Sequence, residues 1–541
     1  MEKYALHLAK PHVIRLTDFL TETAREQIIK KQARIYPKRQ PLPFSALLIG
    51  WRSIAQTPNW ARKLDVDFQV GKNLDSQSSA AVLLFRVKGR VFAATYGYGH
   101  AFVDKGKREN DFGLFVAVNA MNDTDLRNVE KTNLGSAMRD HAQSSAKARL
   151  GTFRIDEALD VIRKIAGSSK GDSFGTIAGT SSLVITAESA IYEIDELAEE
   201  LLKLFTSKEY QKTEFAILDR LRPILDYGLI GLLDGECVKA LNKGSVDFEL
   251  ALPMTISQPI GYVKFEGARI SEKLADVTLA DYVSQQKTNS PVSIESIKKH
   301  KIVAHDLGTD GIIDKWSVYS ALIGSLTYSG TKYVINEGSW YSVEKALVDG
   351  ANQNFMNCKV PFDNNFPLWP KKTLGKKKKV ASAYFDEGEY LKDAAKKSGY
   401  LLFDQDLIPI PGEKGPGVEV CDLLDVKGRR YIHVKKSSRR SSVISHHIKQ
   451  ASNAARLLKT YREFFESFLK KCEEKGGKNL AKEIENSAWS DWTIELRLGD
   501  GPNAKGDYVI PFFSRVSLLE DTRLVRGLDF DLKVGFIKLA K

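Results

Sequence analysis

The sequence predicts an α+β protein of several domains that ends in an α/β domain. Its 541 residues are too many for one hydrophobic core, and about two to four domains are expected. The composition, 43% hydrophobic and 27% charged, is typical of a folded globular protein rather than a disordered or fibrous one. Short apolar runs alternate with segments of helical spacing, which favours the α+β class. We expect domains at 1–185, 186–370 and 371–541.

The first expected domain contains two apolar runs, 80–85 and 91–96, on either side of a Lys-Gly-Arg turn. This pattern predicts a β-hairpin. Residues 112–118 form a third run typical of a strand. Residues 155–165 have apolar side chains at helical spacing and predict a helix. Strands and helices are thus expected side by side in this domain.

The middle domain begins with an amphipathic segment at 194–202, which predicts a helix. Near its end, residues 332–343 predict two strands around a Glu-Gly turn. Trp340 and Tyr341 in this hairpin either stack on nucleic-acid bases or fill the core, and the core is the commoner place for such aromatics. The domain is expected to end where residues 371–379 place six lysines in nine positions, since these cannot pack together in a core.

The charge of the chain is concentrated in one region. The net charge is +12, and residues 371–470 alone carry 22 Lys or Arg against 12 Asp or Glu, an excess of +10. A concentrated positive field attracts polyanions and speeds their encounter. The alternative is a solvated charge run that keeps the protein soluble. We expect this region to bind nucleic acid, with anionic lipid as a weaker alternative because no amphipathic helix with bulky apolar anchors accompanies the lysines.

The sequence also bears on the cellular compartment. No apolar run is long enough to span a bilayer, and the first residues have no apolar segment of the kind that a secretion signal contains. Four widely separated cysteines form no CxxC pair and no metal-ligand spacing. A cytoplasmic protein without a disulfide scaffold or a structural zinc is therefore expected, with no membrane partner.

The segments after the lysine run follow a distinctive order. Residues 384–397 predict a helix that is acidic first and basic last, as the helix dipole favours. Residues 400–403, 418–424 and 430–435 predict three strands, and Ser441 with the next serine begins a predicted long helix to about 470. The order helix, three strands, helix resembles the core of the PD-(D/E)xK superfamily, and the resemblance implies a restriction-endonuclease-like fold.

The same resemblance implies a site for cleaving phosphodiester bonds. Asp422 matches the metal-binding Asp of the superfamily, and Lys435 matches the Lys that orients or activates water. Glu389 or Glu387 would supply a carboxylate from the first helix, and Gln450 lies in the following helix, where one branch of the superfamily has a Gln. The expected cofactor is Mg²⁺ or Mn²⁺, held by Asp422.

One position departs from the superfamily pattern. His433 occupies the place of the acidic residue two positions before the Lys, and a neutral imidazole is a poor ligand for Mg²⁺. Glu419 lies three residues before Asp422 and would need a bulge to reach the same face. Two interpretations stay open: an active metal-dependent nuclease, or a nuclease-like domain that binds nucleic acid without cutting it.

Basic side chains near this site are expected to contact phosphates. Some lie in the lysine run, and the others lie at or just after the junction between the third strand and the next helix. They are Lys376, Lys377, Lys378, Lys379, Lys436, Arg439, Arg440 and His446.

At the level of the whole chain, the sequence resembles a bacterial "sporadically distributed protein" family of unknown function, found in genomic islands. The resemblance rests on the motifs at 112–114, 118–119, 338–341, 419–424, 432–435, 445–446 and 450–452. It implies that His433 belongs to the family's own pattern, and it suggests a role in defence against phage or plasmids. We expect a defence-associated protein that binds DNA, and whether it also cleaves DNA stays open. The alternative is a non-catalytic binding or scaffold protein, and either could form homo-oligomers or bind a defence-system partner protein. An RNA-directed nuclease is a further alternative that the sequence does not distinguish from a DNA nuclease.

Overall fold

The computed structural model describes the chain except for residues 1, 54, 135–138, 157–158, 172, 246, 253–259, 269–271, 287–290, 307–311, 372–384, 413, 437–440, 504–505 and 541. It divides into two compact units. The first comprises Met1–Asn133 and Arg139–Arg222, and the second contains Pro223–Lys541. Sheets and helices occur in both, so the α+β class is confirmed.

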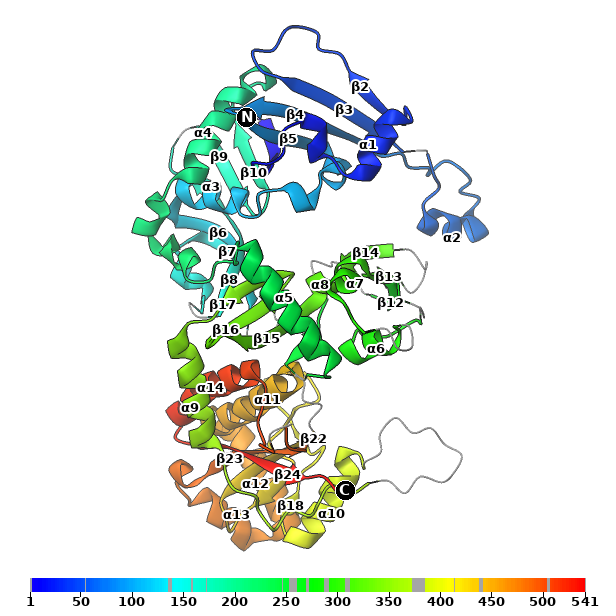
Figure 1. The fold of residues 1–541 in the computed structure, drawn as a ribbon. Coiled ribbons are helices and arrows are strands. Elements are labelled where there is room, and N and C mark those ends of the chain that lie inside the picture. The colour runs from blue at the N-terminus through cyan, green and yellow to red at the C-terminus, as the bar shows by residue number, and fades with distance from the viewer. Residues whose placement is uncertain are drawn as a thin grey trace. The chain divides into compact units, whose positions relative to one another are not determined.

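One antiparallel sheet is the framework of the first unit (Figure 1). Its described strands are β1 (Glu2–Leu8), β2 (Ala33–Tyr36), β3 (Ala46–Arg52), β4 (Ser79–Val87), β5 (Arg90–Gly97), β6 (Met121–Asn133), β7 (Arg139–Ala148), β8 (Asp160–Ser169), β9 (Phe174–Gly179) and β10 (Leu183–Ala187). They pair in the order β2-β3-β4-β5-β1-β10-β9-β8-β6-β7. Strand β1 pairs with β5 and β10 and so joins the two halves of the sheet.

The predicted hairpin at 80–96 is confirmed as β4 and β5. Lys88 and Gly89 form its turn with φ values of 46° and 76°. Positive φ at both central residues is what the favoured two-residue hairpin turn requires, and glycine adopts it without steric cost.

The helices of the first unit are α1 (Glu22–Ile29), α2 (Asn59–Phe68), α3 (Phe112–Ala120) and α4 (Ile194–Thr206). The strand predicted at 112–118 is wrong, because these residues form α3. This helix is buried on nearly every side, so its apolar residues form a continuous run without a helical period. The helix predicted at 194–202 is confirmed as α4.

Helix α4 belongs with the first unit because it packs on α3. The Asn119 side-chain amide donates to the carbonyls of Leu204 and Ser207, at 2.9 and 3.1 Å. The chain stays in this unit to Arg222, past the boundary expected at 185.

The helix predicted at 155–165 is wrong as well. From Asp160 onward the chain forms β8, which pairs with β6 and β9. The apolar spacing fits a helix, but Val161, Ile162 and Ile165 are β-branched and pack well on a pleated surface. Pairing on both sides outweighed the local helical pattern.

The second unit begins with two small antiparallel sheets. One has the order β11 (Phe248–Leu250), β15 (Leu322–Tyr328), β16 (Thr331–Asn336), β17 (Ser339–Ser342), and the other β12 (Tyr262–Glu266), β13 (Lys301–His305), β14 (Ile312–Ser317). Their helices are α5 (Tyr227–Asn242), α6 (Leu279–Ser284), α7 (Ile294–Lys299) and α8 (Val318–Ala321).

The predicted hairpin at 332–343 is confirmed as β16 and β17. Glu337 and Gly338 form its turn, with φ values of 48° and 73°. Trp340 and Tyr341 are buried, and the Trp340 indole N–H donates to the Asp234 carboxylate at 2.9 Å. The core interpretation of these aromatics is therefore confirmed.

The rest of the second unit contains a mixed five-stranded sheet with the order β18 (Leu401–Leu402), β21 (Leu423–Asp425), β22 (Arg430–Lys436), β23 (Thr493–Asp500), β24 (Asp531–Lys538). Neighbours are antiparallel as far as β22, and β22, β23 and β24 run parallel. A separate pair, β19 (Leu407–Ile408) and β20 (Val418–Glu419), lies between β18 and β21 in sequence.

Helices cover both faces of this sheet. They are α9 (Lys345–Cys358), α10 (Glu387–Ser398), α11 (Ser441–Thr460), α12 (Arg462–Gly476), α13 (Lys478–Glu485) and α14 (Phe512–Gly527). Apolar side chains of α9, α11, α12 and α14 share one core with Tyr431 of β22, whereas α10 packs with Ile432 and Val434. Figure 1 shows α11 and α14 beside one another, and they are in contact.

Several predicted elements of this region are confirmed with altered limits. The acidic-then-basic helix is α10, which begins with a capping box between Asp386 and Glu389. The strand predicted at 418–424 is interrupted and forms β20 and β21. The long helix predicted to 470 is two helices, because Tyr461 is extended, with φ −116° and ψ 103°.

The layers of the C-terminal sheet begin before the lysine run. Helix α9 packs on α14 and β24, and Trp369 bridges to Leu539. The boundary expected at 371 thus follows residues that already belong to these layers.

None of the described helices combines the length and the apolar character needed to cross a membrane.

Candidate metal site

Three carboxylates meet where the first and second predicted strands of the C-terminal region lie side by side. Asp404, Glu419 and Asp422 each offer an oxygen, and these oxygens all lie within 4.8 Å of one another. Among the described residues this is the group of His, Cys, Asp and Glu with the spacing of a metal site. Asp404 follows β18, Glu419 ends β20, and Asp422 precedes β21.

Backbone hydrogen bonds hold the three segments together. The Phe403 N–H donates to the Asp422 carbonyl at 2.8 Å, and the Asp422 N–H donates to the Ile432 carbonyl at 2.9 Å. Asp422 is thus held between the end of β18 and the middle of β22. The short pair of β19 and β20 then brings Glu419 back to the same place, with the Gln405 N–H donating to its Oε1 at 3.1 Å.

The carboxyls of Glu419 and Asp422 resist ionisation together. Burial, followed by the charge of Glu419, raises the pKa of Asp422 well above its usual range, although the Val434 N–H donates to its Oδ2 at 2.6 Å. Burial also raises the pKa of Glu419, with the charges of Asp404 and Asp406 adding to the effect. The two carboxyls lie within 4.8 Å of each other, and the charge of Glu419 opposes ionisation of Asp422.

Lys435 lies at the end of β22 and forms an ion pair with Glu387, Nζ to Oε1 at 2.9 Å. Both side chains are about one third exposed (37% and 34%), so the ammonium can reach solvent and substrate. Glu387 is in the first turn of α10. That turn also borders the acidic group, because a carbon placed on Gly388 would lie 3.5 Å from Asp404 Oδ2. The first turn of α10 therefore lies against both Lys435 and Asp404.

His433 is buried in the sheet and is not part of the acidic group. Its ring lies edge-on to that of His447, with centroids 6.1 Å apart, and the buried Nε2 atoms of both have no hydrogen-bond partner among the described residues. Burial and the neighbouring His447 lower the pKa of His433 to about 3. Burial likewise lowers the pKa of His447 to about 4. Both imidazoles are neutral at physiological pH.

The other candidate catalytic residues lie elsewhere. Glu389 accepts from the Asp386 N–H in the capping box of α10, at 3.2 Å. Gln450 is exposed on α11 and is not among the residues that form the acidic group. The structure thus groups Asp422 and Glu419 with Asp404, places Lys435 against the first turn of α10, and leaves Glu389 and Gln450 outside the group.

The expected phosphate contacts are only partly described. Lys436 ends β22, and His446 is exposed on α11. The others lie outside the described residues: Lys376, Lys377, Lys378, Lys379, Arg439 and Arg440.

Sequence reasoning missed Asp404. It directly follows the run 400–403 that predicts the first strand, and an acid at a strand end next to the Asp422 strand was the available signal. Three carboxylates form an all-oxygen donor set, which suits Mg²⁺ or Mn²⁺ better than a softer metal. A divalent ion there would also favour ionisation of the Glu419 and Asp422 pair.

The comparisons with known proteins identify a family and no function. Residues 4–538 match the model described as "Family of unknown function (DUF6119)", and the chain therefore belongs to this family. No curated protein matches the chain, and no solved structure matches it.

Proposed function

We propose that this member of the DUF6119 family binds nucleic acid, DNA foremost, and hydrolyses phosphodiester bonds at the Asp404, Glu419 and Asp422 group. The observation that carries the proposal is the convergence of three carboxylate oxygens within 4.8 Å, bordered by the helix turn that pairs with the partly exposed Lys435. Carboxylates that hold a divalent ion, with a cation nearby, are what phosphodiester hydrolysis requires, because negative charge develops as water attacks phosphorus.

The order of elements supports the proposal. Helix α10, the antiparallel strands β18, β21 and β22, and helix α11 follow one another along the chain. This order is similar to the core of the PD-(D/E)xK superfamily. Asp422 and Lys435 lie on neighbouring strands, as the two motif residues of that core would.

Asp404 would supply the carboxylate that the superfamily pattern has at the position of His433. The side chain at position 433 is a buried, neutral imidazole outside the acidic group. Asp404, from the end of the first strand, would supply the third carboxylate in its place. The proposed site thus keeps three acidic ligands although one of them comes from another strand.

Each residue has a distinct proposed role. Asp404, Glu419 and Asp422 would hold the ion, which when bound supplies Lewis-acid stabilisation of the phosphate oxygens. Lys435 would position the attacking water and offset the charge that develops on phosphorus. Glu387 holds the Lys435 ammonium against the first turn of α10. Water attacks phosphorus, the bond to the leaving oxygen breaks, and that oxygen takes up a proton.

Substrate attraction is proposed to come from the basic excess of residues 371–470. The lysines at 376–379 and the basic residues at 436–440 flank the candidate site in sequence. Counterion release from the phosphate backbone would make this binding strong at low salt and weak at high salt. A role in defence stays a prediction.

The test is cleavage of labelled DNA and RNA by the full chain, with Mg²⁺, Mn²⁺ or EDTA. We expect metal-dependent cleavage that falls about 100-fold or more in Asp422→Asn and in Lys435→Met, because each removes a group that acts in the transition state. Both variants should bind the same nucleic acid nearly as well as the wild type. Replacing Lys376–Lys379 with Gln should instead weaken binding and flatten its salt dependence.

Asp406→Asn is the matched control. Asp406 lies two residues from Asp404, but its carboxylate is paired with Lys471 and Lys475, at 3.2 and 2.6 Å. Its loss should change cleavage far less than Asp422→Asn does, because Asp406 is not a member of the acidic group. Binding without cleavage under all three metal conditions would favour the alternative, a non-catalytic nucleic-acid-binding protein.

A further inference from the structure

The second unit contains a polar cavity, and none of the residues that line it belongs to the acidic group. Its volume is about 460 Å³, within the range of small-molecule sites. It is bounded by the start of β11, by β15 and β16, by α9, and by the segment that joins β23 to α14. That segment follows the carboxyl end of a parallel strand, where open α/β sheets commonly bind ligands.

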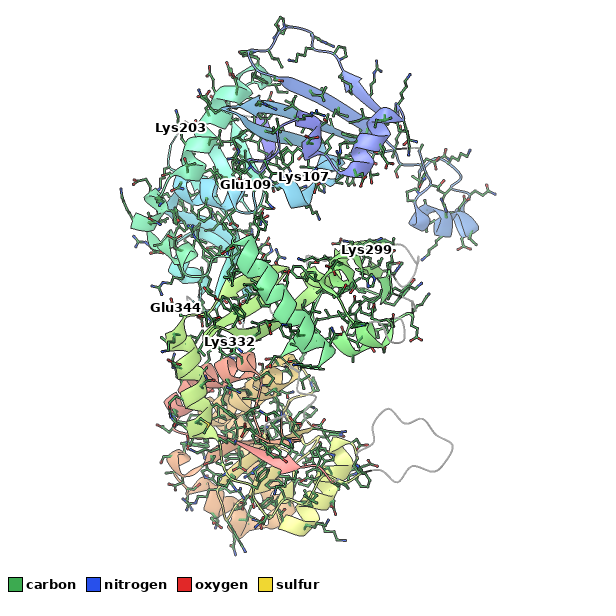
Figure 2. The ribbon with its side chains drawn as sticks, viewed as in Figure 1. Lys107, Glu109, Lys203, Lys299, Lys332 and Glu344 are labelled. Carbon is green, nitrogen blue, oxygen red and sulfur yellow. The ribbon has the colours of Figure 1, made fainter. Side chains whose placement is uncertain are left out.

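Two cations line this cavity. Figure 2 labels Lys332, on β16 at the side of the sheet that faces α14. Its ammonium lies 5.1 Å from the centre of the Phe512 ring, and no carboxylate forms an ion pair with it among the described residues. Burial lowers the pKa of Lys332, and the charge of Arg515 adds to this effect, whereas Asp247 opposes it. The two cations are thus held near each other without a full counter-charge.

Arg515 is fixed in place by its neighbours. Its Nε donates to the Ile510 carbonyl at 2.9 Å, and its Nη1 donates to Asn352 Oδ1 at 2.7 Å. Its guanidinium also lies over Phe355, 5.3 Å from the ring centroid and within the range of about 6 Å for a cation–π contact. Burial lowers the pKa of Arg515 as well. A guanidinium positioned in this way is ready to bind a phosphate without further ordering.

The first turn of α14 forms another wall. The helix has 16 residues, and its N-cap is Pro511, which makes no capping side-chain hydrogen bond. The N–H groups of its first turn have no acceptors within the helix, and the positive end of the helix dipole points the same way. Pro511 and Phe512 both line the cavity, so this helix end borders the same space as Lys332 and Arg515.

We propose that this cavity binds a small phosphorylated ligand of nucleotide size, with its phosphate between Lys332, Arg515 and the first turn of α14. The remaining lining suits the body of such a ligand. Asp247 can accept hydrogen bonds from hydroxyl or amino groups, and Val348 and Ile510 offer apolar surface. The single carboxylate among two cations favours a phosphate ester over a free inorganic anion. The proposal does not depend on the nuclease activity.

The experiment is calorimetric titration of the full chain in EDTA, which keeps metal-mediated binding at the acidic group out of the measurement. The probes are adenosine, AMP, GMP, ATP and inorganic phosphate. We expect a nucleotide to bind at least about 10-fold more tightly than phosphate, and adenosine not to bind, because the charge-assisted hydrogen bonds to phosphate provide most of the affinity. Lys332→Gln should weaken nucleotide binding about 10-fold or more.

Two further variants keep the test decisive. Lys459→Gln is the matched control, since this lysine also lies over an aromatic ring, that of Trp489, but outside the cavity. Its binding should equal that of the wild type. Val348→Phe should block the cavity without changing its charge. The proposal is wrong if no probe binds, if adenosine binds as tightly as AMP, or if Lys332→Gln and Val348→Phe both bind like the wild type.

Discussion

The two ends of strand β22 differ in how their carboxylates are neutralised. At the first end, Arg430 reaches Asp425, Asp363 and Glu495, at 2.7, 2.9 and 3.3 Å. At the far end, no arginine of the described residues forms an ion pair with Asp404, Glu419 or Asp422, and Lys435 is paired with Glu387.

The pKa directions separate the two groups. Burial opposes ionisation of Asp363, but hydrogen bonds from the Asn365 N–H and from Arg430 lower its pKa below the usual range. Glu419 and Asp422 are half-buried, and their pKa values are raised. The first group is complete without a ligand and stabilises the fold. Among the described residues no cation neutralises the second group in this way, and raised carboxyl pKa values of this kind are typical of functional sites.

The largest expected effect is at the first end of β22, where Arg430 neutralises the carboxylates. Arg430→Met should lower the free energy of unfolding by about 3–5 kcal/mol, because it leaves buried carboxylates without their cation. Guanidinium unfolding followed by tryptophan fluorescence measures this. Arg429→Met, which removes an exposed pair with Asp491, should cost at most about 1 kcal/mol. A loss for Lys435→Met as large as that for Arg430→Met would remove the distinction between the two ends.

The next test concerns two buried histidines, His433 in the middle of β22 and His447 on α11. Their pKa values in the folded protein, about 3 and 4, lie below the usual 6.5 of the unfolded chain. Between pH 6.5 and 4 the unfolded chain therefore binds more protons, and the free energy of unfolding falls as the pH falls, by up to about 1.4 kcal/mol per pH unit for each imidazole.

His447→Gln should reduce this slope, measured by unfolding at pH 7, 6 and 5. The adjacent and exposed His446 is the control, and His446→Gln should leave the slope unchanged. Equal slopes for the wild type and His447→Gln would contradict the buried, neutral state of His447.

The smallest expected effect is at the far end of β22. There the free energy of unfolding depends on pH in the opposite direction to that expected for the histidines. The raised pKa values of Glu419 and Asp422 mean that the folded protein binds a proton that the unfolded chain releases above its usual carboxyl pKa. Without metal, the free energy of unfolding should fall as the pH rises through this window. Glu419→Gln removes one of the two competing charges and should raise the free energy of unfolding at pH 8 by about 1 kcal/mol.

The same substitution should weaken Mn²⁺ binding, measured by calorimetry. Asp406→Asn serves as the comparison, because Lys471 and Lys475 lower the pKa of Asp406 against the effect of burial. Its loss should lower stability and leave Mn²⁺ binding unchanged. A Glu419→Gln variant less stable than the wild type at pH 8 would mean that the far end is a structural charge cluster like the first.

Local sequence was sufficient where a short-range signal had no competitor. The hairpins at 80–96 and 332–343 were predictable because Lys-Gly and Glu-Gly turns with positive φ separate two apolar runs. Helix α10 was predictable from its acidic start and basic end. The pairing of Asp422 with Lys435 was a prediction from the resemblance to the PD-(D/E)xK core. The structure places Asp422 against β22 through the hydrogen bond from the Val434 N–H.

Elements that depend on distant partners were not predictable in the same way. The run 112–118 became a helix because the sheet and α4 bury it on nearly all sides, and the segment after Asp160 became a strand because β6 and β9 pair with it. Asp404 joined the candidate site because β18 pairs with β21, and Lys332 met Arg515 across residues far apart in the chain. By itself the sequence determined the fold class, the basic C-terminal region and two of the three carboxylates, Glu419 and Asp422. The tertiary structure decided which carboxylates are neutralised and which are left for a cation, because burial and ion pairing depend on segments that meet only when the chain has folded.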